Sequence, residues 1–293
     1  MPYFLIYCAL QRRLQMKIIN TYPDIILLCD KMDGIFRMEL WENYGAGISQ
    51  ELPDKLKEDS SGYDFNSQML PVLTQVINNR DALKQARDAF TATTTDIEKR
   101  FRQVLKTTLE VDIIFYLGLC NGAGWATTLD GRNAILLGVE KIIELDWHNR
   151  KNMEGLIYHE LGHILHNVKG FVPCEPLEPP AKSIWQLYSE GIAMYCEQLL
   201  CGDFGAYHQN TDDWLDWCVS NKKEVLGEYK KRVRSGESVQ DFFGDWEQWR
   251  GRSNLGYFLG CEFVKSLARR YDLNRLLNLN LFEIEQEFDK FII

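Results

Sequence analysis

Apolar residues three and four positions apart recur through most of the chain and predict a largely helical protein. Between residues 67 and 108 this spacing predicts two helices. A long helix is expected from Asp146 or Asn149 to Gly170, where a glycine can form a left-handed cap. Further helices are predicted over residues 182–201, 212–231, 238–250, 255–271 and 275–291.

Two segments rich in Val, Ile and Leu, from Val111 to Leu119 and from Asn133 to Ile143, lie on either side of the Gly-rich stretch NGAGWATTLDGR. Their composition predicts strands of a small sheet, the second of them at an edge. The polar segment 50–66 is interpreted as a loop or linker, and residues 172–181, which hold four prolines, as a loop that reverses the chain. The order of elements predicts an α+β fold with a mainly helical C-terminal half.

Composition excludes several classes of protein. The 293 residues are 45% hydrophobic and carry a net charge of −9, so a packed core is expected and, with no Lys/Arg-rich run, nucleic acid is not an expected partner. Eight cysteines without a CxxC pair indicate mostly buried thiols in a reducing compartment. The chain has no apolar run of about 20 residues and its first residues lack the pattern of a secretion signal, which predicts a cytoplasmic protein without a membrane partner.

Three of the five histidines fall between residues 159 and 166, and two of them form the HExxH pattern HELGH at 159–163. On a helix His159 and His163 lie about 40° apart, so both can bind one zinc ion at about 2 Å. Glu160 lies about 100° from His159 and can reach a water on the metal without being a ligand. The opposite face is expected to be buried in a core, with the histidines turned to a cleft; its apolar residues are Ile157, Leu161, Ile164, Leu165 and Val168.

A zinc site needs a third protein ligand, and the best candidate is Glu190. It is separated from His163 by 26 residues and lies on the next predicted helix, among Ile, Ala, Met, Leu and Tyr, where an unpaired carboxylate would be costly to bury. The proline-rich turn lets the two helices run back to back. Rival third ligands are Glu197, His208 and Glu178.

These residues resemble the gluzincins, the zinc metallopeptidases that include thermolysin and the zinc aminopeptidases. The resemblance covers roughly residues 110–275 and rests on HELGH, on SEGIAMY at 189–195 and on GYFLGCEFV at 256–264. It implies a zincin-like catalytic domain that binds one Zn²⁺ through His159, His163 and Glu190. Glu160 would be the general base and then the acid, and Tyr257 would donate to the oxyanion.

The resemblance also suggests a division of the chain into three regions. Residues 1–108 form an N-terminal region of unknown role, residues 109–203 the catalytic core, and residues 204–293 a helical subdomain that completes the cleft. By analogy with the clan, the segment from Asn133 to Ile143 is expected to hold an extended peptide as an added strand. Tyr158, Tyr188 and Tyr195 are alternative oxyanion donors.

The sequence departs from these families at several positions. Met194 stands where thermolysin-like enzymes have an Asp that orients a ligand histidine, which leaves that supporting role unassigned. A GxMEN segment, typical of aminopeptidases, is absent. The metzincin pattern fails because His166 occupies its glycine position and Lys169 its third histidine. We expect His166 to be a half-exposed histidine on the helix.

The leading hypothesis is a zinc-dependent metallopeptidase that acts on a peptide or protein substrate. A catalytically degenerate zincin-like domain that binds a peptide or protein without cutting it is the alternative, and another type of zinc hydrolase is a third. Endo- or exopeptidase action, cleavage specificity and oligomeric state are left open by the sequence.

Overall fold

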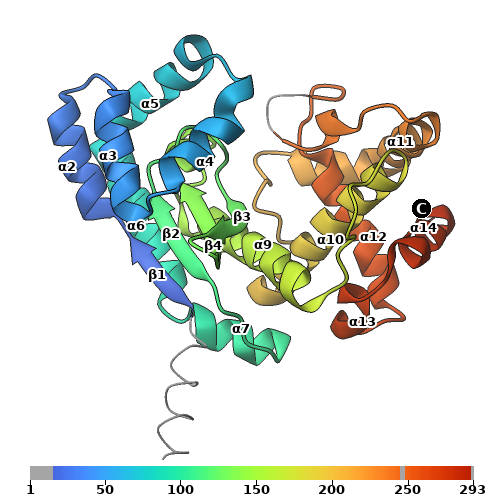
Figure 1. The fold of residues 1–293 in the computed structure, drawn as a ribbon. Helices are drawn as coiled ribbons and strands as arrows, with labels where there is room; N and C mark the ends of the chain where they lie inside the picture. The colour runs from blue at the N-terminus through green and yellow to red at the C-terminus, as the bar shows by residue number, and fades with distance from the viewer. Residues whose placement is uncertain (1–15, 245–247, 292–293) are drawn as a thin grey trace, which may run out of the picture. The chain divides into compact units, whose positions relative to one another are not determined.

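A computed structural model describes residues 16–244 and 248–291 of the chain. The chain divides into two compact units, Met1–Glu160 and Leu161–Ile293. The division falls within helix α9 (Arg150–Lys169), so one continuous helix contains residues of both units (Figure 1). The three functional regions expected from the sequence stay a prediction.

The first unit contains a four-stranded mixed sheet with the order β1-β2-β4-β3 (Figure 1). Strands β1, β2 and β4 are parallel and β3 is antiparallel to β4; the strands are Lys17–Asn20, Asp112–Tyr116, Trp125–Leu129 and Arg132–Gly138 in chain order. All five residues of β2 are buried, as expected for an inner strand of a largely parallel sheet. The prediction of an α+β chain with a small sheet is confirmed.

Two details of the predicted sheet are wrong. Strand β4 lies between β2 and β3, so the segment that begins at Asn133 is an inner strand and cannot accept a peptide at its edge. The segment expected to continue to Ile143 as a strand becomes helix α8 (Val139–Glu144) after Gly138. The outer strand β3 was missed within the Gly-rich stretch. Asp130 and Gly131 join it to β4 as a two-residue hairpin, and both have positive φ.

The helices of the first unit differ from the prediction in two places. The segment 50–66, expected to be a loop, contains α4 and a short 3-10 turn, because Leu52, Pro53 and Leu56 form a buried face. Residues 67–108 form three helices in place of two, with a new start at Asn79, whose side chain accepts from the backbone N–H of Ala82. The helices before α8 are α2 (Tyr22–Met32), α3 (Met38–Ile48), α4 (Leu52–Asp59), α5 (Leu70–Ile77), α6 (Arg80–Thr94) and α7 (Ile97–Leu105).

The second unit is helical in its described residues. It contains the later part of α9 and α10 (Ala181–Cys201), α11 (Trp214–Ser235), α12 (Leu255–Ala268), α13 (Leu273–Leu277) and α14 (Leu281–Lys290). Of the helix predicted over 238–250, the described residues form only a 3-10 turn, Gln240–Phe242, and a bridge between Trp249 and Arg252. The helix predicted over 275–291 is divided, because Asn280 forms a capping box that starts α14.

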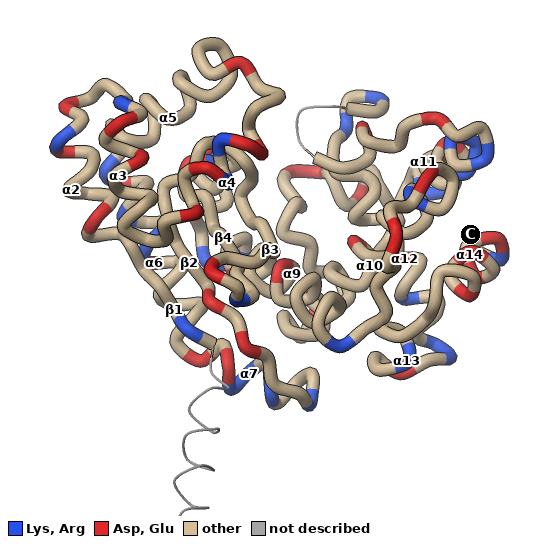
Figure 2. Tube along the Cα trace, in the orientation of Figure 1, with Lys and Arg blue, Asp and Glu red and all other residues tan. Residues whose placement is uncertain are grey.

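Acidic and basic residues are both spread over each unit, with basic residues prominent along α11 and acidic residues along α14 (Figure 2). No helix among the described residues is long and apolar enough to cross a membrane. The seven cysteines in the described part of the chain are free thiols, and four of them, Cys29, Cys196, Cys218 and Cys261, are buried. Cys8 and the predicted absence of a secretion signal concern residues 1–15, which lie outside the described residues.

Candidate metal centre

Helix α9 carries the HExxH segment as predicted, but the histidine side is more buried than expected. His159 is 3% exposed and Glu160 7% exposed, while His163 is half-buried. On the opposite side Ile157, Leu161, Ile164 and Leu165 are buried as predicted, and Val168 is exposed. His159 and Glu160 therefore lie in the interior, where electrostatic interactions are strong.

Gly162, the fourth residue of HELGH, sets how closely α9 approaches α10. A Cβ atom at this position would lie 2.8 Å from the Cα of Ala193 and 3.0 Å from its carbonyl oxygen. Only a residue without a side chain lets the two backbones come this close. This approach brings His163 on α9 next to Glu190 on α10.

His159, His163 and Glu190 form one group whose ligand atoms all lie within 4.8 Å of one another. The Nε2 atom of His163 is 3.2 Å from Oε2 of Glu190, and both side chains are partly exposed. Two ligands of one tetrahedral zinc ion lie roughly 3.3 Å apart when each bond is about 2 Å long. The set of two imidazoles and a carboxylate is one that zinc accepts.

A second group contains two of the rival ligands. The ligand atoms of His159, Glu197 and His208 also lie within 4.8 Å of one another, and all three residues are buried. Both carboxylate oxygens of Glu197 accept from His208, one from its backbone N–H at 2.8 Å and one from Nδ1 at 2.7 Å. The Nε2 atom of His208 lies 2.9 Å from the side-chain amide nitrogen, Nε2, of Gln209. Each carboxylate oxygen of Glu197 and each ring nitrogen of His208 thus already has one hydrogen-bond partner within the protein.

The protonation of His208 fits this arrangement. Burial lowers its pKa to about 3, an effect opposed by the charge of Glu190 and reinforced by that of His163. The ring is therefore neutral, donates from Nδ1 to Glu197 and accepts from Gln209 at Nε2. Neither Glu178, which is exposed, nor Met194, which is fully buried, belongs to either group.

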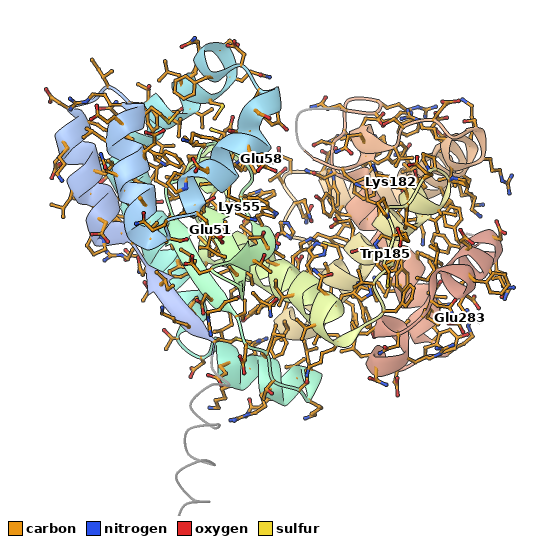
Figure 3. All side chains as sticks on the ribbon, viewed as in Figure 1. Glu51, Lys55, Glu58, Lys182, Trp185 and Glu283 are labelled. Carbon is orange, nitrogen blue, oxygen red and sulfur yellow. The ribbon has the colours of Figure 1, made fainter. Side chains whose placement is uncertain are left out.

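The expectation for His166 is wrong. It is 1% exposed, and its ring packs against Trp185 at 5.3 Å and Tyr188 at 5.9 Å between centroids (Trp185 is labelled in Figure 3). Burial, followed by the charge of His163, lowers its pKa to about 4. Neither ring nitrogen has a hydrogen-bond partner among the described residues, so His166 acts as a neutral packing residue.

The other two segments of the resemblance contain glycines with a packing role. A Cβ at Gly191 would lie 2.2 Å from the carbonyl oxygen of Gly260, and one at Gly260 would lie 2.4 Å from that of Leu187. Helices α10 and α12 therefore pack backbone to backbone, and they form the most extensive contact between two elements in the described part of the chain. The glycines of SEGIAMY and GYFLGCEFV hold Glu190 in place whatever the chemistry of the site.

The tyrosine candidates are in different environments. Tyr257 lies half-buried on α12 with its ring edge against Phe243 at 5.7 Å between centroids, and its oxyanion role stays a prediction. Tyr188 is buried, and its hydroxyl donates to the carbonyl oxygen of Leu276. Tyr158 is buried beneath the guanidinium of Arg100, while Tyr195 is half-buried beside Phe204.

Gly124, which precedes β3, is a site residue that the sequence analysis missed. A Cβ there would lie 2.7 Å from Oε1 of Glu160 and 2.9 Å from Leu156. The backbone before β3 therefore touches the carboxylate of the expected general base. The Asp-Gly pair at 130–131 was the sequence signal for the hairpin, and a hairpin would have placed this segment at the edge of the sheet.

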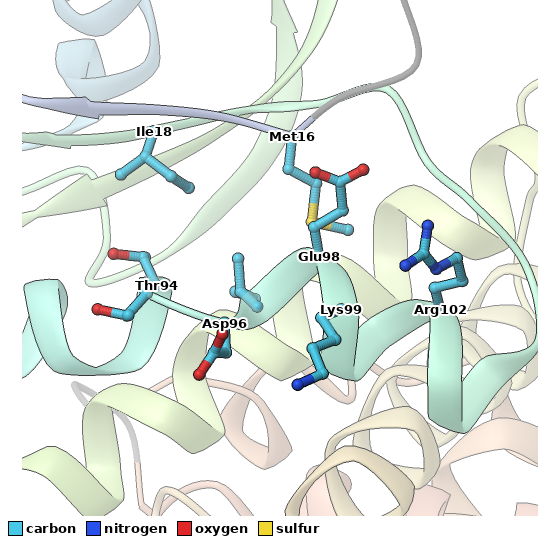
Figure 4. A pocket seen from close by; sticks show the side chains of 9 residues that line it. Met16, Ile18, Thr94, Asp96, Glu98, Lys99 and Arg102 are labelled. Atoms are coloured by element: carbon cyan, nitrogen blue, oxygen red, sulfur yellow. The ribbon is translucent and has the colours of Figure 1, made fainter. Parts of the chain in front are cut away.

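A pocket of about 440 Å³ lies elsewhere in the first unit, at the start of β1 and the junction of α6 with α7 (Figure 4). Met16, Ile18, residues 94–99 and Arg102 line it. None of the predicted ligands or catalytic residues is among its lining residues. The pocket therefore adds nothing to the chemistry of the histidine helix.

Comparison of the chain with protein-family models, with curated proteins and with solved structures finds no match in any of the three. The functional conclusion consequently depends on the geometry of the His and Glu groups.

Proposed function

We propose that the protein is a zinc-dependent metallopeptidase of gluzincin type, with His159, His163 and Glu190 as ligands. The observation that carries the proposal is the group of these three residues, whose ligand atoms lie within 4.8 Å of one another on two packed helices. Glu160, the expected general base, is the neighbour of the first ligand.

This group is preferred over the second because its ligands are more accessible to water and substrate and because fewer of their ligand atoms are engaged in hydrogen bonds. A catalytic zinc site keeps one position open for water and substrate, and His163 and Glu190 are both partly exposed. In the other group Glu197 and His208 are buried and hydrogen-bonded to each other. Glu197 fits better as the carboxylate that orients His159, the role for which the sequence offered no Asp at position 194.

A bound zinc ion supplies Lewis acidity, which polarises the scissile carbonyl and makes a water molecule more acidic. Glu160 accepts a proton from the attacking water and delivers it to the leaving amine, as a buried and oriented carboxylate can do. The outer edge of β3 offers backbone groups for an extended peptide, in place of the segment 133–143. Such a peptide would pass Gly124, which touches Glu160.

The first test is the metal content of the purified protein. We expect one equivalent of zinc in the wild type and less than about half an equivalent in His163→Ala, because a ligand is lost. His148→Ala is the matched control, since His148 belongs to neither His/Glu group and contacts Asp146. Equal zinc contents in His163→Ala and His148→Ala would refute the ligand assignment.

The second test is cleavage of a mixed peptide library, read by mass spectrometry. Glu160→Gln should keep its zinc and lose hydrolysis by about 10³-fold, within the range for a general base. Glu154→Gln, on the same helix and paired with Arg150, is the control. Zinc-loaded wild type that cleaves no peptide would indicate the degenerate binding module, and activity on other amides or esters alone would indicate another zinc hydrolase.

A further inference from the structure

The segment of residues 117–124, here named loop 117–124, joins β2 to β3 and ends against the carboxylate of Glu160. Gly124 is its last residue, and its backbone leaves no room for a Cβ beside Oε1 of Glu160. The position of this loop therefore determines what lies next to the general base. Side chains from several parts of the first unit hold it.

The N-terminal helix α3 holds the start of the loop. The indole nitrogen of Trp41 donates to the carbonyl oxygen of Leu117 at 2.9 Å, and the backbone N–H of Leu117 donates to the hydroxyl of Tyr44 at 3.0 Å. Trp41 is fully buried. The hydroxyl of Tyr44 is itself fixed by Thr21 at 2.7 Å.

Helix α4 holds the middle of the loop and the strand that follows. The side-chain amide of Asn121 donates to the carbonyl oxygen of Leu56 at 2.9 Å and to Asp59 at 2.8 Å. The ammonium of Lys55 lies over the ring of Trp125, the first residue of β3 (Lys55 is labelled in Figure 3). The region before residue 109, whose role the sequence left unknown, thus supports the loop beside Glu160.

Glu140 is the buried carboxyl group at the centre of these contacts. Its two carboxylate oxygens accept from the backbone N–H groups of Gly118 at 2.7 Å and Cys120 at 3.0 Å. The side chain is fully buried, and a Cβ at Gly118 would lie 2.5 Å from its Oε1. Burial raises the pKa of Glu140 to about 7, and the backbone N–H groups of Gly118 and Cys120 oppose that rise, so the two hydrogen bonds favour the carboxylate form.

The far end of the loop is fixed by the backbone of β4. The N–H of Gly138 donates to the carbonyl oxygen of Ala123 at 3.1 Å, and a Cβ on Gly138 would lie 2.6 Å from the carbonyl oxygen of Gly122. Glu140 follows Gly138 by two residues. A displacement of the loop at Gly118 and Cys120 is therefore passed on to Gly124 through a short, tightly packed segment.

We propose that Glu140 is a positioning residue, which holds loop 117–124 so that Gly124 keeps the carboxylate of Glu160 in one orientation. This inference rests on the proposed function, since it assigns Glu140 a part in proton transfer by Glu160. Glu140 belongs to neither of the two His/Glu groups that could hold a metal ion. Its loss should lower kcat and leave zinc content and KM nearly unchanged.

The test compares Glu140→Gln with Glu144→Gln, an exposed position on the same helix that pairs with Lys141. Gln keeps the length of the side chain but replaces one acceptor oxygen with an NH₂ group that faces a backbone N–H. We expect full zinc content, faster amide hydrogen exchange within loop 117–124, about a tenfold lower kcat and a KM within about twofold of wild type. Tyr44→Phe, which removes the acceptor for Leu117, should show the same pattern with smaller effects and serves if Glu140→Gln does not fold.

Two results distinguish this inference from the proposed function. A wild type that binds zinc but hydrolyses no substrate refutes the hydrolase. A hydrolytic wild type whose Glu140→Gln and Tyr44→Phe variants match Glu144→Gln in amide exchange and in kcat refutes the role of Glu140.

Discussion

The close approach of α10 and α12 at Gly191 predicts a large effect of adding one methyl group. In Gly191→Ala the new Cβ would lie 2.2 Å from the carbonyl oxygen of Gly260 and 2.6 Å from its carbonyl carbon. Both partners belong to helix backbones and cannot move away by a rotamer change, so the helices must separate by roughly 1 Å to reach ordinary contact distance. Overpacking of this kind costs about 1–3 kcal/mol.

A second glycine provides the matched control. Gly227 is an exposed residue within α11, and a Cβ there meets nothing within 4 Å. Ala is about 1 kcal/mol better than Gly in a helix, so Gly227→Ala should be more stable than wild type. Because both contacts in Gly191→Ala are with helix backbone, we expect an overpacking cost at the upper end of this range, about 3 kcal/mol. The helix term of about 1 kcal/mol offsets part of it and leaves a net loss of about 2 kcal/mol.

The assay is urea-induced and thermal unfolding of the two variants, with zinc content measured in parallel. The expected difference of about 3 kcal/mol corresponds to roughly 6–12 °C between their melting temperatures. Gly191→Ala should also bind zinc less tightly, because Glu190 is the adjacent residue. Equal unfolding midpoints for Gly191→Ala and Gly227→Ala would show that the two helices do not pack as described.

Three further predictions follow from other contacts. Glu197→Gln should bind zinc about 10–100-fold more weakly and still reach one equivalent at saturation, as measured by competition with a chelator; an unchanged affinity would contradict its orienting role. Burial lowers the pKa of His166 to about 4, so the free energy of unfolding should fall by up to about 3 kcal/mol as pH falls from about 6.5 to 4. In urea titrations at each pH, His166→Phe should abolish this dependence. A variant with the same pH dependence as wild type would contradict the prediction. Gly131→Ala should destabilise the protein by about 1 kcal/mol in urea unfolding, since Gly131 has a φ of +71° in the hairpin turn; a gain in stability would mean that the turn differs.

Local patterns predicted the long helices well and the sheet poorly. Helix α9 and helix α10 were expected within a few residues of their observed ends, because their apolar spacing extends over five turns or more. Strand β3 was missed because it is short and lies within a Gly-rich stretch without a run of Val, Ile or Leu, although its Trp and Thr residues favour strands. Helix α4 was missed for a similar reason, since only one face of its eight residues is apolar.

The site residues show the same limit. The pairing of His159 with His163 follows from their spacing alone. The choice of a third ligand among Glu190, Glu197 and His208 depends on which side chains lie together in the folded chain. Glu190 lies in one group with His159 and His163. Glu197 and His208 form a hydrogen bond with each other. Gly124 and Glu140 carried no local pattern that links them to Glu160.

The sequence by itself determined that a helix would present two histidines at metal-binding spacing, with Glu160 beside them, because a helix of 3.6 residues per turn places residues four apart on one face. The tertiary structure alone decided which carboxylate stands opposite them and which loop touches Glu160. Those neighbours depend on backbone approaches at Gly162 and Gly191 and on a strand order that places β3 at the edge. Such contacts join residues far apart in the chain, and no local periodicity encodes them.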